Sequence, residues 1–376
     1  MFFGLISTNM RLITLNDKTL KKIVVSFPHE WVAYSPTILN LVEIFRNYSE
    51  IKVLFIDNGK YNNRELPDQF ISLKVPPTLF KILALVGLYE KYKILLLTSH
   101  LKRCDASIAI GVDNVGMFSV QRVYPKGHFL SLEIKRDKYF GMLSSQAIQS
   151  IAIQSEERLK YLYTDSPPFP VFFIPNSPIY YPFKHTSDNN PTMFKTIFLG
   201  NIIPSHGIYH CIDAINGIPF ASITLKGHLN KSVKKSILKK YKKLILEGRL
   251  IIDEAYTQQS ELIRSIQSFD AGFCLYDFEI IKKNDFNYIS SPSGKMYTYF
   301  AAGVPIIGSD ILGLRLVKDF NAGCLLQDIN IDNIGKAIET IRFEHELMRL
   351  NCLNAAKQLD FMSYAMKYLK FVLNLK

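Results

Sequence analysis

The chain of 376 residues has the composition of an ordinary folded protein, with 48% apolar and 21% charged residues, which argues against long disordered tails. This length is large for one hydrophobic core, so two domains are expected. The 45 lysines and arginines exceed the 33 acidic residues and give a net charge of +12. Such a charge favours a polyanionic neighbour: nucleic acid, an anionic membrane surface or phosphorylated ligands.

Cysteine usage and the amino terminus bear on location. The five cysteines are scattered and odd in number, and no pair has the spacing of a metal site, so a reducing cytosol fits best. Residues 1–15 place no charge before their short apolar run and offer no cleavage site of small residues, which makes them a poor signal peptide. The longest apolar run, residues 82–89, is too short to span a bilayer. We expect a cytoplasmic protein with at most peripheral contact at the inner face of the plasma membrane.

Strands and helices alternate through the first half of the chain. Helical periods such as residues 35–49 separate the strands, and there Ser35 is expected to cap the first turn while Pro36 suits its first position. This alternation is typical of a parallel sheet covered on both faces. Short runs rich in Ile and Val predict buried strands at residues 21–27, 51–57, 105–111, 127–134 and 149–155.

Residues 78–103 are apolar and flanked by basic side chains, which makes them a candidate for contact with an anionic membrane. A buried crossover helix explains the apolar part equally well. The flanking basic residues are Lys74, Lys81, Lys91, Lys93, Lys102 and Arg103.

A proline-rich stretch, residues 174–192, separates two regions of regular alternation. It carries four prolines, several Asn and Ser, and no apolar period, so we place the hinge between two domains here. Two doubly wound α/β domains in tandem leave a cleft between them, and ligands of such sheets bind at the carboxyl ends of the strands. After the hinge, strands are expected at residues 195–201, 220–227, 249–255 and 270–276, and helices at 208–215 and 259–269.

The most basic stretch is residues 229–249, whose lysines surround one apolar helical stripe. A solvated helix face is the favoured interpretation, with membrane contact as the alternative. The stripe comprises Val233, Ile237, Leu238, Tyr241, Leu244 and Ile245, and the lysines are Lys231, Lys234, Lys235, Lys239, Lys242 and Lys243.

Residues 290–310 bring Lys295 to the start of a short helix that ends at Ala-Ala-Gly and runs into an apolar strand. A helix N-terminus attracts phosphate through its unpaired amides. Gly294 lets the backbone approach a ligand, Ser293 could add a hydroxyl donor, and Lys295 adds a mobile charge. An ordinary loop-to-helix junction with a solvated lysine is the alternative, and these residues alone leave both open.

This segment resembles the donor-binding motif of glycosyltransferases of the GT-B fold, especially family-4-like enzymes (glycosyl transferases group 1). Their pattern is Ser/Pro, Lys, a short helix ending in Ala and Gly, then a Pro-Val-Ile strand. The first half of the chain is similar only in general layout. The matching residues are Ser291, Pro292, Ser293, Gly294 and Lys295, then residues 296–303 and 304–310, and the resemblance extends to residues 197–215, 248–276 and 320–341.

The resemblance implies a fold of two Rossmann-like domains facing a central cleft, residues 1–180 on the acceptor side and 181–355 binding a nucleotide-diphosphate sugar. Residues 356–376 would form a helix returning to the first domain. Lys295 would stabilise the leaving diphosphate without a metal, and no Asp-x-Asp motif for a metal is present. No cofactor is implied beyond the donor substrate. The implied donor-binding residues are Gly200, Asn201, His206, Tyr256, Ser293, Gly294, Lys295, Thr298 and Arg315.

The chain departs from the family at four positions. Thr298 replaces the Glu that grips the donor ribose, Ser290 replaces a partner Glu, and Asn201 and His206 stand where an Arg and a Lys are usual. Arg315 would compensate as a second cation or form a surface ion pair. The departures leave open a non-catalytic protein that keeps the fold and binds partners or glycan.

Polar residues after strands of the first half are the catalytic candidates. Glu133 and Asp113 would serve as a general base of an inverting transfer or hold an acceptor hydroxyl, with salt-bridge or capping roles as the alternative. His29 and Glu30 would line the acceptor side, although a lone His is more often structural, and Trp31 is expected in the core.

The sequence therefore predicts transfer of a sugar to a glycan or lipid-linked acceptor, and by family analogy a role in bacterial surface-polysaccharide assembly. Nucleic acid is disfavoured because the lysine-rich helix has little aromatic interleaving. A dehydrogenase is disfavoured because no Gly-x-Gly-x-x-Gly turn follows the first strand.

Overall fold

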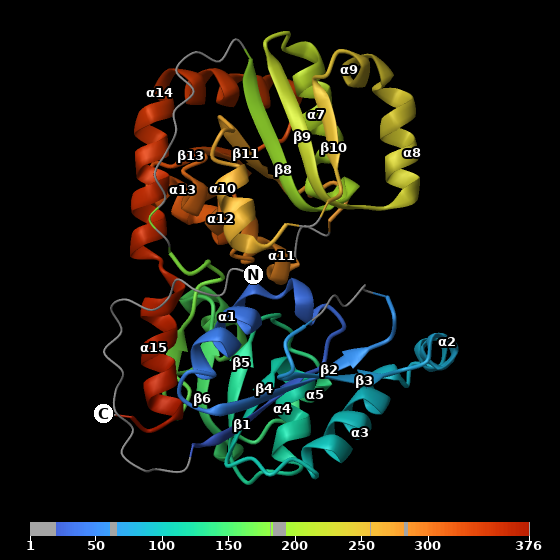
Figure 1. Ribbon diagram of the computed structural model, residues 1–376, viewed down its shortest axis with the longest axis vertical. Coiled ribbons are helices and arrows are strands. Elements are labelled where there is room, and N and C mark those ends of the chain that lie inside the picture. Colours follow the sequence, from blue (N-terminus) through green and yellow to red (C-terminus); the bar gives the residue numbers. More distant parts are fainter. Residues whose placement is uncertain are drawn as a thin grey trace.

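The computed structural model describes residues 20–60, 66–180, 182, 193–255, 257–281 and 285–375. Two parallel sheets, each with helices packed on both faces, are arranged along the long axis of the molecule (Figure 1). The predicted α/β class with two doubly wound domains is confirmed. No helix in the described residues is both long and apolar enough to span a membrane.

The first sheet has seven strands in the order β3-β2-β1-β4-β5-β6-β7. Side chains alternate between its faces, so Val25 packs toward α1 and α15 while Val24 packs toward α3 and α4. The order reverses between β1 and β4, and this is where a doubly wound sheet opens a crevice for ligands. The strands are β1 Lys22–Phe27, β2 Glu50–Asp57, β3 Phe70–Lys74, β4 Ile108–Val112, β5 Gly127–Ser131, β6 Ile148–Ile153 and β7 Val171–Phe173. The helices are α1 Pro36–Phe45, α2 Pro77–Leu85, α3 Tyr89–Leu101, α4 Asp113–Gln121, α5 Lys138–Gly141 and α6 Glu156–Leu162.

The second sheet has six strands in the order β10-β9-β8-β11-β12-β13, with its own reversal between β8 and β11. Two apolar clusters on opposite faces hold α7 and α8 on one side and α10, α12 and α13 on the other. The strands are β8 Phe194–Ile202, β9 Ala221–Leu229, β10 Leu250–Asp253, β11 Ala271–Cys274, β12 Ile306–Ser309 and β13 Gly323–Leu326. The helices are α7 Ile208–Gly217, α8 Lys231–Lys240, α9 Lys242–Leu246, α10 Gln259–Ser265, α11 Phe286–Ile289, α12 Gly294–Ala302, α13 Arg315–Asp319, α14 Ile331–Gln358 and α15 Phe361–Val372.

The last helix, α15, lies against the first domain, whereas α14 runs along the second (Figure 1). Phe361, Tyr368 and Leu369 are fully buried in the cluster that also contains Phe45 of α1. Asp360 caps α15 by accepting from the amides of Met362 and Ser363. The chain thus crosses between the domains twice, once between β7 and β8 and once between α14 and α15.

Two local expectations were wrong. Ser35 occupies the N-cap position of α1, but its side chain makes no capping hydrogen bond, because a 3-10 turn over Val32–Tyr34 leads the backbone into the helix. The lysine-rich stretch is not one helix: non-helical dihedral angles at Tyr241 separate α8 from α9. Leu238, inside α8, is 45% exposed and does not join the buried stripe.

Candidate functional site

Lys295 lies in the first turn of α12, at the point where the second sheet reverses its order. The helix begins after Ser293 and ends at Gly303, whose left-handed conformation suits glycine. The amine of Lys295 lies 5.4 Å from the ring centroid of Phe198 on β8 and 5.9 Å from that of Tyr276, which follows β11. Lys295 therefore stands at the carboxyl edge of the sheet, where ligands of such folds bind.

The surroundings of Lys295 leave its charge uncompensated. Within the described part of the chain, no carboxylate forms an ion pair with this amine. Burial lowers the pKa of Lys295 below its ordinary value. Two aromatic faces stabilise the cation only partly, since such contacts contribute about 0.5–2 kcal/mol. A partly desolvated ammonium without a counterion is prepared for an anionic ligand.

Gly200 and His206 lie beside this amine. Gly200 has a φ of 88°, and a Cβ added there would lie 3.5 Å from Cε of Lys295, so the backbone of β8 passes close to the lysine. His206 donates from Nδ1 to the carbonyl of Asn201 at 2.9 Å, since a carbonyl only accepts. Burial and the charge of Lys295 lower the pKa of His206 to about 3. His206 is therefore neutral at physiological pH and does not replace the cation usual at this position in the family.

Of the other predicted donor residues at α12, only Thr298 has its side chain engaged inside the helix. Thr298 donates its hydroxyl to the carbonyl of Gly294 at 2.9 Å, inside the helix. Ser293 holds the N-cap position without a capping bond from its side chain. A Cβ on Gly294 would lie 3.1 Å from Nδ2 of Asn176 in the hinge, so the N-terminus of α12 lies at the boundary between the domains. Tyr256 lies outside the described residues.

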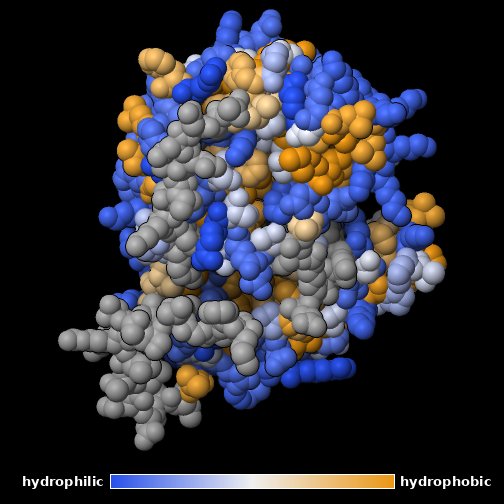
Figure 2. All heavy atoms as spheres, turned by 45° about the horizontal axis from the view of Figure 1, so that its top comes forward, coloured by the Kyte–Doolittle hydropathy of each residue, from blue (hydrophilic) through white to orange (hydrophobic). Residues whose placement is uncertain are grey.

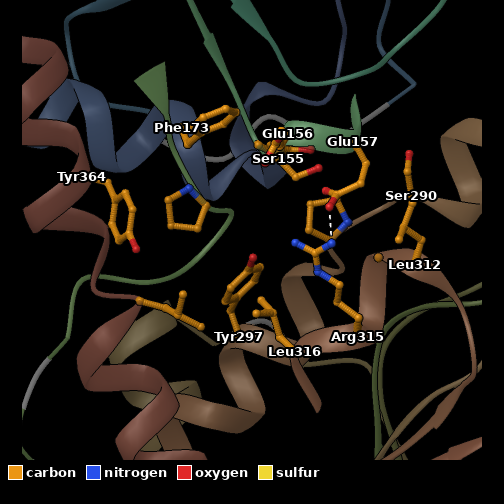
Figure 3. A pocket seen from close by; sticks show the side chains of 15 residues that line it. Ser155, Glu156, Glu157, Phe173, Ser290, Tyr297, Leu312, Arg315, Leu316 and Tyr364 are labelled. Atoms are coloured by element: carbon orange, nitrogen blue, oxygen red, sulfur yellow. Dashed lines mark hydrogen bonds and ion pairs between the residues drawn. The ribbon is translucent and has the colours of Figure 1, made fainter. Parts of the chain in front are cut away.

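Arg315 contacts the first domain. Its guanidinium forms an ion pair with Glu157 of α6, which is the alternative that the sequence left open. Figure 3 shows this pair at one end of a pocket between the domains, with Tyr297 and Tyr364 further along. Lys295 is not among the residues that line this pocket.

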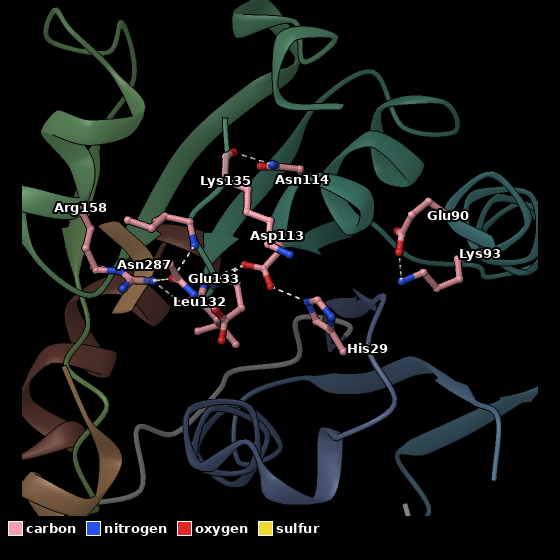
Figure 4. Close-up of polar contacts among 11 residues, drawn as sticks. His29, Glu90, Lys93, Asp113, Asn114, Leu132, Glu133, Lys135, Arg158 and Asn287 are labelled. Carbon is pink, nitrogen blue, oxygen red and sulfur yellow. Dashed lines mark hydrogen bonds and ion pairs between the residues drawn. The ribbon is translucent and has the colours of Figure 1, made fainter. Parts of the chain in front are cut away.

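On the first domain, His29 and Asp113 form a hydrogen-bonded pair. Nε2 of His29 lies 2.6 Å from Oδ2 of Asp113 (Figure 4). The other carboxylate oxygen, Oδ1, accepts from the amides of Leu132 and Glu133 at 2.7 and 2.8 Å. Asp113 has a φ of 50°, a costly conformation for a residue with a side chain. The surrounding bonds hold it there, because β1, β4 and β5 are neighbours and their carboxyl ends meet.

Glu133 lies next to this pair and faces the second domain. Its pKa is raised by burial and by the nearby Asp113 carboxylate. Asn287 of α11 donates to Oε2 of Glu133 at 2.6 Å (Figure 4). Arg158, only 1% exposed, donates to Asn287 at 3.1 Å and to Ser290 at 3.3 Å. Two predicted catalytic carboxyl residues thus lie side by side, and Glu133 is hydrogen-bonded to the opposite domain.

Glu30, the other predicted acceptor residue, points away from His29 toward α3. It accepts from the hydroxyl of Tyr89 at 2.7 Å and from the amide of Asn58 at 3.1 Å. Burial and Glu30 raise the pKa of Tyr89 well above its ordinary value, so this hydroxyl remains a donor. In the described residues, no group of three or more His, Cys, Asp or Glu side chains could hold a metal ion.

No protein-family model matches the chain, and no curated protein matches it in sequence. Solved structures match it over almost its whole length. HepE of Anabaena, solved with UDP, has a TM-score of 0.66 at 12% identity and covers 95% of this chain and 100% of its own. Sucrose-phosphate synthase of Thermosynechococcus elongatus has a TM-score of 0.65 at 13% identity, and the match covers 95% of this chain and 99% of the synthase. The lipopolysaccharide outer core galactosyltransferase WaaB has a TM-score of 0.59 at 13% identity, and the match covers 93% of this chain and 98% of WaaB.

The chain has the GT-B fold. At these identities the likeness concerns the architecture alone. In this GT-B chain, Lys295 and Gly200 lie at the carboxyl edge of the second sheet, and His29, Asp113 and Glu133 follow strands of the first.

Sequence reasoning missed three residues that make contacts between the two domains. Asn287 and Arg158 join Glu133 to the second domain, and Asn176 approaches Gly294 while accepting from Thr37 of α1 at 3.0 Å. The one local signal near them is Ser155, a good N-cap residue, whose side chain accepts from the amide of Arg158 at the start of α6. Nothing local indicates that the guanidinium three residues later is buried.

Proposed function

We propose that this GT-B protein is a glycosyltransferase that moves a sugar from a nucleotide-diphosphate sugar to an acceptor. The observation that carries the proposal is the amine of Lys295, partly desolvated at the N-terminal turn of α12 and without a carboxylate partner among the described residues. A diphosphate leaving there gains negative charge as the sugar carbon becomes positive, and a fixed cation stabilises that change. HepE, solved with UDP and with UDP-glucose, supports a nucleotide sugar as donor.

The remaining residues take roles that follow from their contacts. Gly200 lets a phosphate approach the backbone beside Lys295. Asp113 orients His29 through Nε2, which leaves Nδ1 as the nitrogen that accepts a proton from an acceptor hydroxyl. Glu133, whose pKa is raised by burial and by the Asp113 carboxylate, holds the acceptor or shares in that proton transfer. Lys295 supplies the charge that a metal ion would otherwise supply, so the proposed transfer is independent of metal.

The proposed acceptor is a glycan or a lipid-linked glycan, and the proposed role is bacterial surface-polysaccharide assembly in the cytoplasm at the inner membrane face. The net charge of +12 supports a location at an anionic surface. The similarity in fold to a lipopolysaccharide galactosyltransferase supports the acceptor class.

A second candidate is a GT-B protein that binds ligands without turnover. Two observations favour it: His206 is neutral, and the hydroxyl of Thr298 is used inside α12. Such a protein would lack the second phosphate cation and the ribose carboxylate of the family.

Calorimetry with a panel of nucleoside diphosphates tests the proposal. We expect one of them to bind, and Lys295→Ala to weaken that binding by roughly 1.5–3 kcal/mol, the range for a hydrogen bond to a charged group. The matched control is Lys336→Ala, an exposed lysine of α14 in the same domain. If no nucleotide binds, or if both lysine variants bind like the native protein, the second candidate replaces the first.

A further inference from the structure

Helix α2 projects from the edge of the first domain with apolar side chains in solvent. None of its residues is buried. The exposed fraction is 88% for Leu85, 60% for Ile82, 56% for Val86 and 42% for Leu88. Figure 1 shows α2 beyond β3 at the margin of the molecule, and in Figure 2 hydrophobic residues gather on this projection at the right of the view. Single exposed apolar residues are ordinary, whereas such a cluster marks an interaction surface.

Basic side chains surround this apolar surface. Lys74, Lys81 and Lys91 are exposed, and in the described part of the chain none of them forms an ion pair. The one acidic residue between positions 74 and 93 is Glu90, which pairs with Lys93 at 2.7 Å. A second copy of this surface would be repelled by its own charge. An anionic bilayer fits both properties, because apolar side chains enter the acyl boundary while lysines contact lipid phosphates.

The exposed segment adjoins the acceptor side of the cleft. Helix α2 follows β3 directly, so it leaves from the carboxyl edge of the first sheet. Tyr89 begins α3 one residue after Leu88, and its hydroxyl donates to Glu30 at 2.7 Å. Asn58 donates to the same carboxylate at 3.1 Å. The tip of the projection and the loop after β1 are therefore held together.

We propose that α2 and residues 86–88 dock this protein on an anionic membrane, with Ile82, Leu85 and Val86 in the headgroup and acyl boundary. Lys74, Lys81 and Lys91 then contact lipid phosphates. The docked helix brings the loop of Glu30 to the bilayer, so a lipid-linked acceptor reaches the cleft from the membrane. This inference rests on the proposed glycosyl transfer for the acceptor, but the docking itself is measured without any substrate.

Flotation of the whole chain with vesicles tests the docking. The native protein should bind vesicles containing phosphatidylglycerol, more weakly in high salt, and bind pure phosphatidylcholine vesicles poorly. Leu85→Asp should lower binding about tenfold or more, and Lys81→Glu about fivefold or more on anionic vesicles only. Phe343→Asp is the apolar control, since Phe343 of α14 is 91% exposed. Lys235→Glu, in the basic helix α8, is the charge control.

The outcomes separate docking from catalysis. The proposal is overturned if the native protein ignores anionic vesicles, if Leu85→Asp binds them like the native protein, or if Lys235→Glu abolishes binding while Lys81→Glu does not. It is also overturned if sedimentation shows a dimer that Leu85→Asp dissociates, because the occupant would then be a second copy. Leu85→Asp should bind nucleotide normally, so loss of vesicle binding does not count against the transferase proposal.

Discussion

Gly227 on β9 occupies a position that leaves no room for a side chain. Its φ is 143°, and an added Cβ would lie 2.0 Å from the carbonyl oxygen of Gly200 on the neighbouring strand. We expect Gly227→Ala to displace Gly200, and with it the approach to Lys295. The strained backbone alone costs on the order of 1–3 kcal/mol, and the contact adds to this. Urea unfolding should therefore show lower stability, and calorimetry weaker nucleotide binding.

The matched control is Gly217→Ala at the end of α7, where an added Cβ meets no atom within 4 Å. Equal stability of the two glycine variants would contradict the close approach of β8 and β9.

At the scale of single residues, the sequence predicted that Lys295 begins a helix but not the electrostatics around it. The turn before Lys295 and the glycine after its helix are local signals, and local spacing is sufficient to find them. The neutrality of His206 depends on burial and on its distance from Lys295, which only the folded sheet establishes. The pairing of His29 with Asp113 likewise needs β1 and β4 to be neighbours.

At the scale of elements, β5 and α15 meet at a buried histidine. His128 is 4% exposed, its Nδ1 lies 2.8 Å from Oγ of Ser150, and its ring is edge-on to Tyr368 and Phe371 of α15. Burial lowers the pKa of His128 to about 4. Between this value and the unfolded value of about 6.5, the unfolded chain binds a proton that the folded protein does not. Stability therefore rises with pH in this window and falls on acidification by up to about 1.4 kcal/mol per pH unit.

We expect the urea midpoint to drop from pH 7.5 to pH 5, and His128→Phe to reduce that drop. His228→Asn, which removes an exposed histidine of β9, should retain it. His206 also titrates in the acid range, but it is present in the native protein and in His128→Phe. The difference in pH dependence between these two proteins therefore isolates His128. An unchanged pH dependence in His128→Phe would contradict this account of the contact between β5 and α15.

Five of the seven strands of the first sheet could be predicted from Ile and Val runs, because parallel strands inside a sheet are buried on both faces. The edge strands β3 and β7 were not predicted, since few of their residues are buried. The burial of residues 78–103 could not be predicted, because an apolar run suits a buried helix and a membrane-facing helix equally. The structure contains one buried and one exposed helix: α3 buries Ile94 and Leu97 against the sheet, while α2 buries nothing. Which part turns inward depends on the loop between the two helices and on packing with β2, and neither is encoded locally.

At the scale of the whole molecule, the two domains are joined by a small set of contacts around α11. Asn287 accepts from Arg158, donates to Glu133, and accepts from the amide of Ile134 at 3.3 Å. Phe286 stacks on Tyr161 of α6 with ring centroids 4.4 Å apart. Asn287 stands 129 and 154 positions along the chain from Arg158 and Glu133. A single sequence offers no signal for pairs so far apart, so this part of the site could not be predicted.

Asn287→Ala should loosen this boundary between the domains. It leaves the carboxyl group of Glu133 without its amide donor and the buried guanidinium of Arg158 without one of its acceptors, and water solvates both groups better when the domains separate. We expect the radius of gyration from small-angle X-ray scattering to increase and glycosyl transfer to slow. Nucleotide affinity should hardly change, because Lys295, Gly200 and their neighbours all belong to the second domain.

The control is Asn351→Ala, which removes a side-chain hydrogen bond to the carbonyl of Asn321 within the second domain. It should leave scattering and transfer unchanged. Identical scattering from both asparagine variants would mean that the remaining contacts, among them Arg315 with Glu157 and Phe286 with Tyr161, are sufficient to hold the domains together. A loss of nucleotide affinity in Asn287→Ala would mean that the donor site extends across the boundary and is completed only when Glu133 and α11 are in contact.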